Sequence, residues 1–156
     1  MASNIVYLLK PYANNVLKRS VKTPKLYYLD TGLAAYLTKW NTAEVLKSGA
    51  MAGAFFETFV VSEIIKSYYN QGILEPSLYF YRDKEQREID LLIEENGVLY
   101  PLEMKKHADP KPGDVKAFDI LNELPGIRRG PGGVICTYDR LTTLKGEDKV
   151  IPVWFI

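Results

Sequence analysis

The sequence has little of what several classes of protein require. Cys136 is the only cysteine and His107 the only histidine, which excludes an internal disulfide and leaves no ligand set for a zinc site or a catalytic triad. No apolar run approaches the roughly 18 residues of a membrane-spanning helix, and the N-terminus lacks the layout of a signal peptide. No Gly-x-x-x-x-Gly-Lys-Ser/Thr motif occurs, so the phosphate-binding loop of an ATPase is missing from these residues. These absences predict a cytoplasmic domain without membrane contact or ATP binding of its own.

Length and charge are consistent with one folded domain. A chain of 156 residues can bury about 70% of its unfolded surface. The net charge of +1 argues against strong nonspecific nucleic-acid binding by the whole domain. The segment before Asp30, however, contains no acidic residue and has five basic ones: Lys10, Lys18, Arg19, Lys22 and Lys25. Such a segment either contacts nucleic acid or docks as a linker on the core or on a neighbouring module.

The stretch from Arg87 to Lys105 predicts a β-hairpin. Asn96-Gly97 is typical of a two-residue type I′ turn, because both positions need positive φ. Such a turn places Glu95 opposite Val98, and the pairing extends outward from there. The flanking segments are nearly continuous apolar runs, which indicates strands covered on both faces.

This register places Asp90 opposite Glu103, with Lys105 on the same face. Two adjacent carboxylates repel, and a divalent cation such as Mg²⁺ or Mn²⁺ relieves that repulsion. The lysine could orient or deprotonate a water molecule. The alternative is an ordinary ion pair between Lys105 and one of the carboxylates.

The elements around the hairpin form a recognisable order. Asp114 is expected to cap the helix over 114–124. Glu57 lies in the helix over 54–69, among aromatic residues that favour packing on the sheet. The predicted elements are a helix over 54–69, strands over 78–81, 88–93 and 98–105, a helix over 114–124, and strands over 133–138 and 150–155.

In this order, Asp90 followed by Glu103-Met104-Lys105 resembles the signature of the PD-(D/E)XK nuclease superfamily. The resemblance implies an α/β restriction-endonuclease-like core (α-β-β-β-α-β-β) with a central mixed sheet flanked by helices. It further implies that Asp90 and Glu103 bind the metal, that Lys105 positions the water, and that Glu57 supports the metal site.

Three longer motifs carry a closer resemblance, to an uncharacterised domain at the C-terminal end of prokaryotic AAA-type ATPases. They run from Arg19 to Leu37, from Phe56 to Glu63 and from Tyr79 to Asp83. The resemblance implies an ATPase module upstream in the same polypeptide, where ATP would bind. It also implies two parts here: a basic linker or winged-helix-like remnant over 1–45 and a nuclease-like domain over 46–156.

Two functions follow from these resemblances. The first is metal-dependent hydrolysis of a phosphodiester in DNA or RNA, and the second is a catalytically inactive, nuclease-derived module that docks on or regulates the ATPase. Arg82 and Arg87 could hold a phosphate, or could form ion pairs with Glu85 or Glu88 instead. The expected nucleic-acid contacts are Lys18, Arg19, Lys22, Lys25, Arg82 and Arg87.

Overall fold

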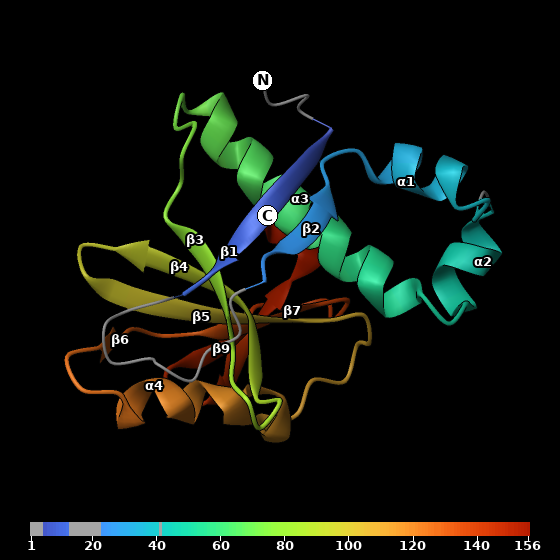
Figure 1. Cartoon of the computed structure of the whole chain (residues 1–156). Helices are drawn as coiled ribbons and strands as arrows, with labels where there is room; N and C mark the ends of the chain where they lie inside the picture. The colour runs from blue at the N-terminus through green and yellow to red at the C-terminus, as the bar shows by residue number, and fades with distance from the viewer. Residues whose placement is uncertain (1–4, 13–22, 41) are drawn as a thin grey trace.

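The computed structural model describes residues 5–12, 23–40 and 42–156, and within them nine strands form one mixed sheet (Figure 1). The strands are β1 (Val6–Pro11), β2 (Lys25–Tyr28), β3 (Leu78–Arg82), β4 (Glu88–Glu95), β5 (Val98–Lys105), β6 (Arg128–Arg129), β7 (Gly133–Cys136), β8 (Thr142–Lys145) and β9 (Asp148–Pro152). The helices are α1 (Thr31–Leu37), α2 (Ala43–Ser48), α3 (Ala52–Asn70) and α4 (Asp119–Glu123), with 3₁₀ turns η1 (Pro112–Phe118) and η2 (Val153–Phe155).

The strand order is β2-β1-β3-β4-β5-β7-β9-β8, with β6 beside β5. Strand β4 pairs antiparallel with both β3 and β5, whereas β5, β7 and β9 run parallel to one another. Strand β1 pairs in parallel with β3 and antiparallel with β2. The two strands within the basic N-terminal segment are therefore part of the same sheet as the hairpin.

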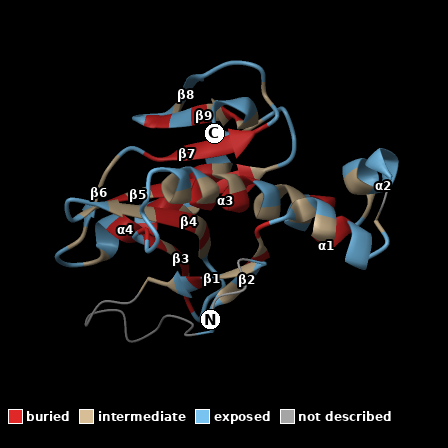
Figure 2. Ribbon diagram, turned by 90° about the horizontal axis from the view of Figure 1, so that it is seen from above, coloured by how far each residue is buried: buried red, intermediate tan, exposed pale blue. Residues whose placement is uncertain are grey.

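Helices cover both faces of this sheet (Figures 1 and 2). On one face α3 packs against the strands, with a buried core that includes Val60, Val61, Ile65, Leu91 and Leu102. On the other face η1 and α4 pack through Val115, Phe118, Ile120 and Leu121. Double coverage explains why β4 and β5 are apolar almost throughout, as the sequence predicted.

The expected hairpin turn is confirmed. Asn96 and Gly97 have φ values of 52° and 72°, and Glu95 pairs with Val98. The ladder continues from there to the pair Leu91 and Leu102. Helix α3 extends the predicted 54–69 helix by a residue or two at each end, and Gly72 follows it with a φ of 81°.

Three expectations about the C-terminal half were wrong in detail. The helix expected over 114–124 is a 3₁₀ turn followed by a short α-helix, and Asp114 lies inside it, where its Oδ2 accepts the Lys111 N–H at 2.7 Å. The last strand, expected over 150–155, is β9, which ends at Pro152. Strand β8 was not expected, because it is a mostly exposed edge strand without apolar alternation.

Within the described residues, no helix combines the length and the apolar character that a membrane crossing requires.

Candidate functional site

A β-bulge in β4 shapes the site. Tyr79 pairs with Leu92 and Tyr81 with Ile89, so two steps along β3 match three steps along β4. Ile89 and Leu92 accordingly lie in the core beneath α4, whereas Leu91 lies in the core beneath α3. The extra residue falls at Asp90-Leu91 and changes the direction of the Asp90 side chain.

The expected backbone pairing of Asp90 with Glu103 is not found. The β4–β5 ladder ends at Leu91 and Leu102, and the Asp90 carboxylate instead accepts the Met104 N–H at 3.0 Å. Asp90 and Glu103 nevertheless lie close together, because Asp90 binds the backbone N–H of the residue that follows Glu103. The negative charge of Asp90 therefore contributes to the raised pKa of Glu103. Lys105 Nζ lies 3.0 Å from Glu103 Oε2, as the ion-pair alternative expected.

Lys25 is the centre of a second group of charges beside this pair. Its Nζ lies 2.9 Å from Glu57 Oε1, 2.5 Å from Glu88 Oε1 and 3.8 Å from Asp90 Oδ1. The Tyr27 hydroxyl also donates to Glu57 Oε1, at 2.5 Å. Strand β2, helix α3 and strand β4 thus each contribute to one charged cleft.

The cleft has a volume of about 380 Å³. The ionisable residues that line it are Lys25, Tyr27, Glu57, Arg82, Glu88 and Asp90. We call these six residues, together with Glu103 and Lys105, the charged site. Arg82 completes it through two contacts with Glu88 Oε2, at 2.7 Å from Nε and 2.6 Å from the terminal nitrogen.

The pKa values of the charged site follow its balance of burial and charge. Burial and the charge of Asp90 raise the pKa of Glu103 to about 8, although Lys105 opposes the shift. Burial, and then the charge of Glu57, also raise the pKa of Asp90. Burial opposes ionisation of Glu88, but Lys25 and Arg82 outweigh it and lower the pKa of that carboxyl.

The charged site combines four carboxyl groups with three basic side chains. Glu103, with a pKa of about 8, is largely protonated at neutral pH. Lys25, Arg82 and Lys105 each lie within 3.0 Å of a carboxyl oxygen. Burial opposes the charge of Lys25, but Glu57 and its neighbours raise the pKa of this lysine overall.

Asp90 and Glu103 have the donor chemistry that a divalent cation needs. Glu103 is buried and Asp90 is half-buried, and Mg²⁺ typically takes one or two carboxylates plus water. Glu57 fits this role less directly, because its Oε1 is already bound by Lys25 and Tyr27. Across the described residues, no three Asp, Glu, His or Cys side chains form a ready-made metal-binding group.

Of the expected nucleic-acid residues that the structure describes, two lie together and one lies elsewhere. Lys25 and Arg82 lie in the charged site, whereas Arg87 closes the β3–β4 turn by binding Asp83 at 2.7 Å and approaching Glu85 at 3.4 Å. Lys18, Arg19 and Lys22 lie outside the described residues. For Arg82 and Arg87, the alternative of ion pairs with Glu88 and Glu85 is the one found.

Sequence reasoning missed the shared role of Tyr27, Glu88 and Lys25. Lys25 was expected either to contact nucleic acid or to belong to a linker that docks on the core or on a neighbouring module. The one available signal was the basic, acid-free character of the segment ahead of a carboxylate-bearing hairpin. That signal does not reveal which lysine enters the core.

Comparisons with known proteins identify two families of unknown function. Residues 52–156 match the family described as "Domain of unknown function (DUF4143)", whose members are known as C-terminal domains associated with AAA ATPases. Residues 1–44 match the family described as "Domain of unknown function (DUF8612)".

Two curated relatives are uncharacterised proteins of Mycobacterium tuberculosis and Mycobacterium bovis. Each is 32% identical over 107 residues, which cover 68% of this chain. The matched region spans only 23% of each relative's length. No solved structure significantly matches the chain.

Proposed function

The chain belongs to the family described as Domain of unknown function (DUF4143), and we propose that it serves an AAA-type ATPase as a metal-dependent phosphodiesterase module with a restriction-endonuclease-like core. The observation that carries this proposal is the meeting of Asp90 and Glu103 beside Lys105 where β4 and β5 separate. The order α3-β3-β4-β5-α4-β7 supports the proposed core. The ATPase would lie in the same polypeptide, and the substrate would be DNA or RNA.

Asp90 and Glu103 would hold Mg²⁺ or Mn²⁺, and the bound ion would supply charge stabilisation at the phosphoryl group. Lys105 is placed beside Glu103, where its ammonium would orient the attacking water. Lys25 and Arg82 line the adjacent cleft, and they would contact the phosphate backbone in exchange for their ion pairs with Glu88. Glu57 would act on the metal site only indirectly, by holding Lys25 and Tyr27.

A second candidate is an inactive interaction module of the ATPase. The observation that favours it is Lys25, whose ammonium binds carboxylates from both α3 and β4 and so neutralises charges that a metal would otherwise compensate. In this alternative the charged site holds strands and helix together, and the surface of the domain contacts the ATPase.

Calorimetric titration with Mg²⁺ and Mn²⁺ distinguishes the two candidates. The wild-type domain would be compared with Asp90→Asn, Glu103→Gln and the control Glu147→Gln, which removes an exposed carboxylate from the β8–β9 turn. Cleavage of single-stranded DNA, double-stranded DNA and RNA would be followed in the same samples.

The proposal expects metal binding in wild type and control, no binding in either site variant, and cleavage that depends on both carboxylates. Because binding to Glu103 must release its proton, affinity should rise from pH 7 to pH 9. Absence of metal binding at pH 9 in a folded wild-type domain would overturn the hydrolytic function in favour of the interaction module.

A further inference from the structure

The ammonium of Lys25 lies where three carboxylates converge. Its Nζ binds Glu57 at 2.9 Å and Glu88 at 2.5 Å, and it lies 3.8 Å from Asp90 Oδ1. The side chain is only 16% exposed, and the ammonium stands over the Phe80 ring, 5.4 Å from the centroid. An ammonium held in this way compensates the same negative charge that a bound metal ion would compensate.

Asp90 connects this ammonium with the proposed metal site. Its Oδ2 accepts the Met104 N–H at 3.0 Å, whereas Oδ1 is the oxygen beside Lys25. A metal ion bound at about 2.1 Å from Oδ1 would lie no more than about 6 Å from Lys25 Nζ, because the two distances add to at most that length. Charges at such a separation change the proton affinity of a carboxyl by roughly 10- to 1,000-fold. The positive charge of Lys25 therefore opposes metal binding at Asp90.

Lys25 and the carboxylates come from separately matched segments of the chain. Lys25 lies within residues 1–44, whereas the carboxylates lie within residues 52–156. Strand β2, which carries Lys25, has four residues at the edge of the sheet and pairs, among the described strands, with β1 alone. An edge strand is hydrogen-bonded along one side only. Withdrawal of β2 would therefore leave the pairing of β3, β4 and β5 intact.

We propose that Lys25 is a tethered competitor of the metal ion, which keeps divalent cations weakly bound while β2 is in place and permits tighter binding when Lys25 is withdrawn. The inference rests on the proposed function, because the ion concerned is the one that Asp90 and Glu103 would hold. With the ammonium in place, Glu57 is occupied and an ion at Asp90 faces a like charge. Without it, the Glu57 carboxylate becomes available beside Asp90. The position of β2 thus sets the metal affinity of the charged site.

Titration with Mn²⁺ at pH 9, followed by calorimetry, tests this competition. Glu103, with a pKa of about 8, is largely ionised at this pH, whereas the neighbouring carboxylates raise the pKa of Lys25 and keep it charged. Lys25→Met removes the charge but keeps an unbranched side chain, and Lys25→Arg keeps the charge. Lys66→Met is the matched control, because it removes a lysine that pairs with Glu63 on a more exposed part of α3.

Mn²⁺ should bind Lys25→Met at least about tenfold more tightly than it binds wild type. The affinities of Lys25→Arg and Lys66→Met should equal that of wild type. Asp90→Asn added to Lys25→Met should abolish the gain, which would locate the bound ion at the charged site.

The folding of Lys25→Met is followed in the same samples, because three carboxylates lose their shared cation in this variant. Thermal unfolding and far-ultraviolet circular dichroism would be recorded with and without Mn²⁺. Mn²⁺ should raise the Tm of Lys25→Met more than that of wild type, and should restore helix and strand signal if the variant is unfolded without metal. A variant that Mn²⁺ neither stabilises nor refolds would overturn the inference.

The outcomes separate this inference from the function on which it rests. Mn²⁺ binding of equal affinity to wild type and Lys25→Met would overturn the inference and leave the hydrolytic function standing. Binding to Lys25→Met alone would support the inference and count against hydrolysis by the wild-type domain. Absence of binding to both folded proteins would overturn both.

Discussion

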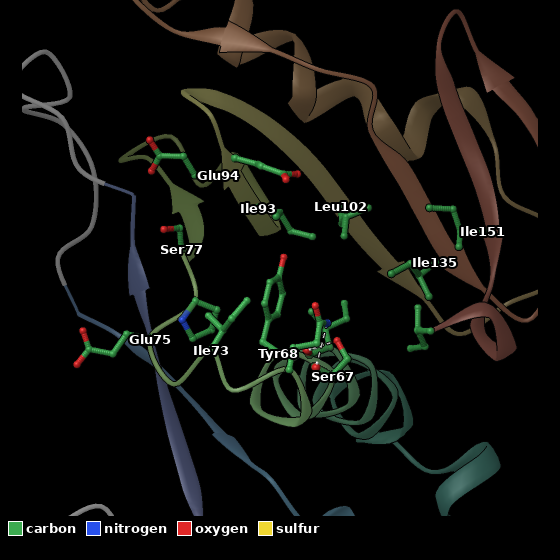
Figure 3. Close-up of a pocket in the computed structure, with 15 residues that line it drawn as sticks. Ser67, Tyr68, Ile73, Glu75, Ser77, Ile93, Glu94, Leu102, Ile135 and Ile151 are labelled. Carbon is green, nitrogen blue, oxygen red and sulfur yellow. Dashed lines mark hydrogen bonds between the residues drawn. The ribbon is translucent and has the colours of Figure 1, made fainter.

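The two hollows beside α3 show two ways in which one helix and one sheet manage polar groups. The N-terminal half of the helix contributes Glu57 to the charged site, whereas the C-terminal half contributes Ile64 and Tyr68 to an apolar hollow of about 650 Å³ between α3 and the sheet (Figure 3). In the charged site, Glu57 and Glu88 are paired with cations from other elements. Near the apolar hollow, the carboxylates of Glu75 and Glu95 are exposed to water. Depth, rather than number of charges, decides whether an internal partner is needed.

Removal of Lys25 is expected to have the largest effect on stability. Lys25→Met leaves Glu57, Glu88 and Asp90 without their shared cation, and breaking a buried ion pair from one side is strongly destabilising. We expect a loss of about 3 kcal/mol in the free energy of unfolding, measured by urea denaturation at pH 7.

Lys66→Met is the matched control for this experiment. Lys66 pairs with Glu63 on a more exposed part of α3, so its loss should cost less than about 1 kcal/mol. Equal stability of the two variants would show that the carboxylates around Lys25 do not depend on its charge, and the contrast drawn between the two hollows would then be wrong.

Glu103 should make stability depend on pH. Its pKa of about 8 in the folded protein lies above the ordinary value of 4.5, so the folded state holds a proton that the unfolded state has released. The stabilisation is fully present below the unfolded pKa and is lost as pH rises through the folded pKa, at a slope of up to about 1.4 kcal/mol per pH unit. Between pH 6 and pH 8 we expect wild type to lose about 2 kcal/mol relative to Glu103→Gln, measured by urea denaturation. Parallel pH profiles for the two proteins would show that Glu103 is ionised in the fold.

Asp83 should have the opposite dependence on pH. Burial opposes its ionisation, but the backbone amide and the guanidinium of Arg87 outweigh burial and lower the pKa. Asp83 accepts the Glu85 and Arg87 N–H groups at 2.9 Å each. Its contribution is therefore present above the unfolded pKa and is lost as pH falls through the lower, folded pKa.

We expect Asp83→Asn to lower the free energy of unfolding by about 1.5 kcal/mol at pH 7. Thermal unfolding from pH 7 down to pH 3.5 should show the difference from wild type decreasing toward the acidic end. A difference that grows with acidity would contradict the assigned ionisation of Asp83.

The hairpin at the centre of the fold could be predicted from the sequence because its determinants are local. Asn96-Gly97 fixes the turn, and the apolar runs fix the coverage of both faces. The bulge at Asp90 could not be predicted in this way, because it arises from pairing with β3 rather than from the hairpin itself. The predicted register of the hairpin is found from the turn to Leu91 and Leu102, and the ladder ends one pair before Asp90 and Glu103.

The cation at the charged site could not be predicted, for a related reason. Lys25 comes from β2, which reaches the site because β1 pairs with β3. The amino-acid pattern of β1 and β2 does not reveal which strands they pair with. Nonlocal strand order therefore decides which of the N-terminal basic residues becomes buried.

The smallest expected effect concerns the apolar hollow and sharpens the contrast with the charged site. Ser67 is exposed at the mouth of this hollow, on α3, and its hydroxyl donates to Ile64 O at 2.8 Å. Ser67→Leu should raise the free energy of unfolding by about 0.5 kcal/mol, because leucine favours helix more than serine does and covers part of the aliphatic floor of the hollow, to which Ile93 and Leu102 contribute.

Ser48→Leu, on the exposed end of α2, is the control that gains helix propensity without this floor. Thermal unfolding would measure both. A stabilisation confined to Ser67→Leu would show that the hollow tolerates an apolar occupant, whereas equal gains would attribute the effect to the helix alone. A charged site that loses stability on removal of one lysine, beside an apolar hollow that gains stability when partly filled, would show that burial at the two ends of α3 is limited by different groups, charges at one end and unfilled apolar surface at the other.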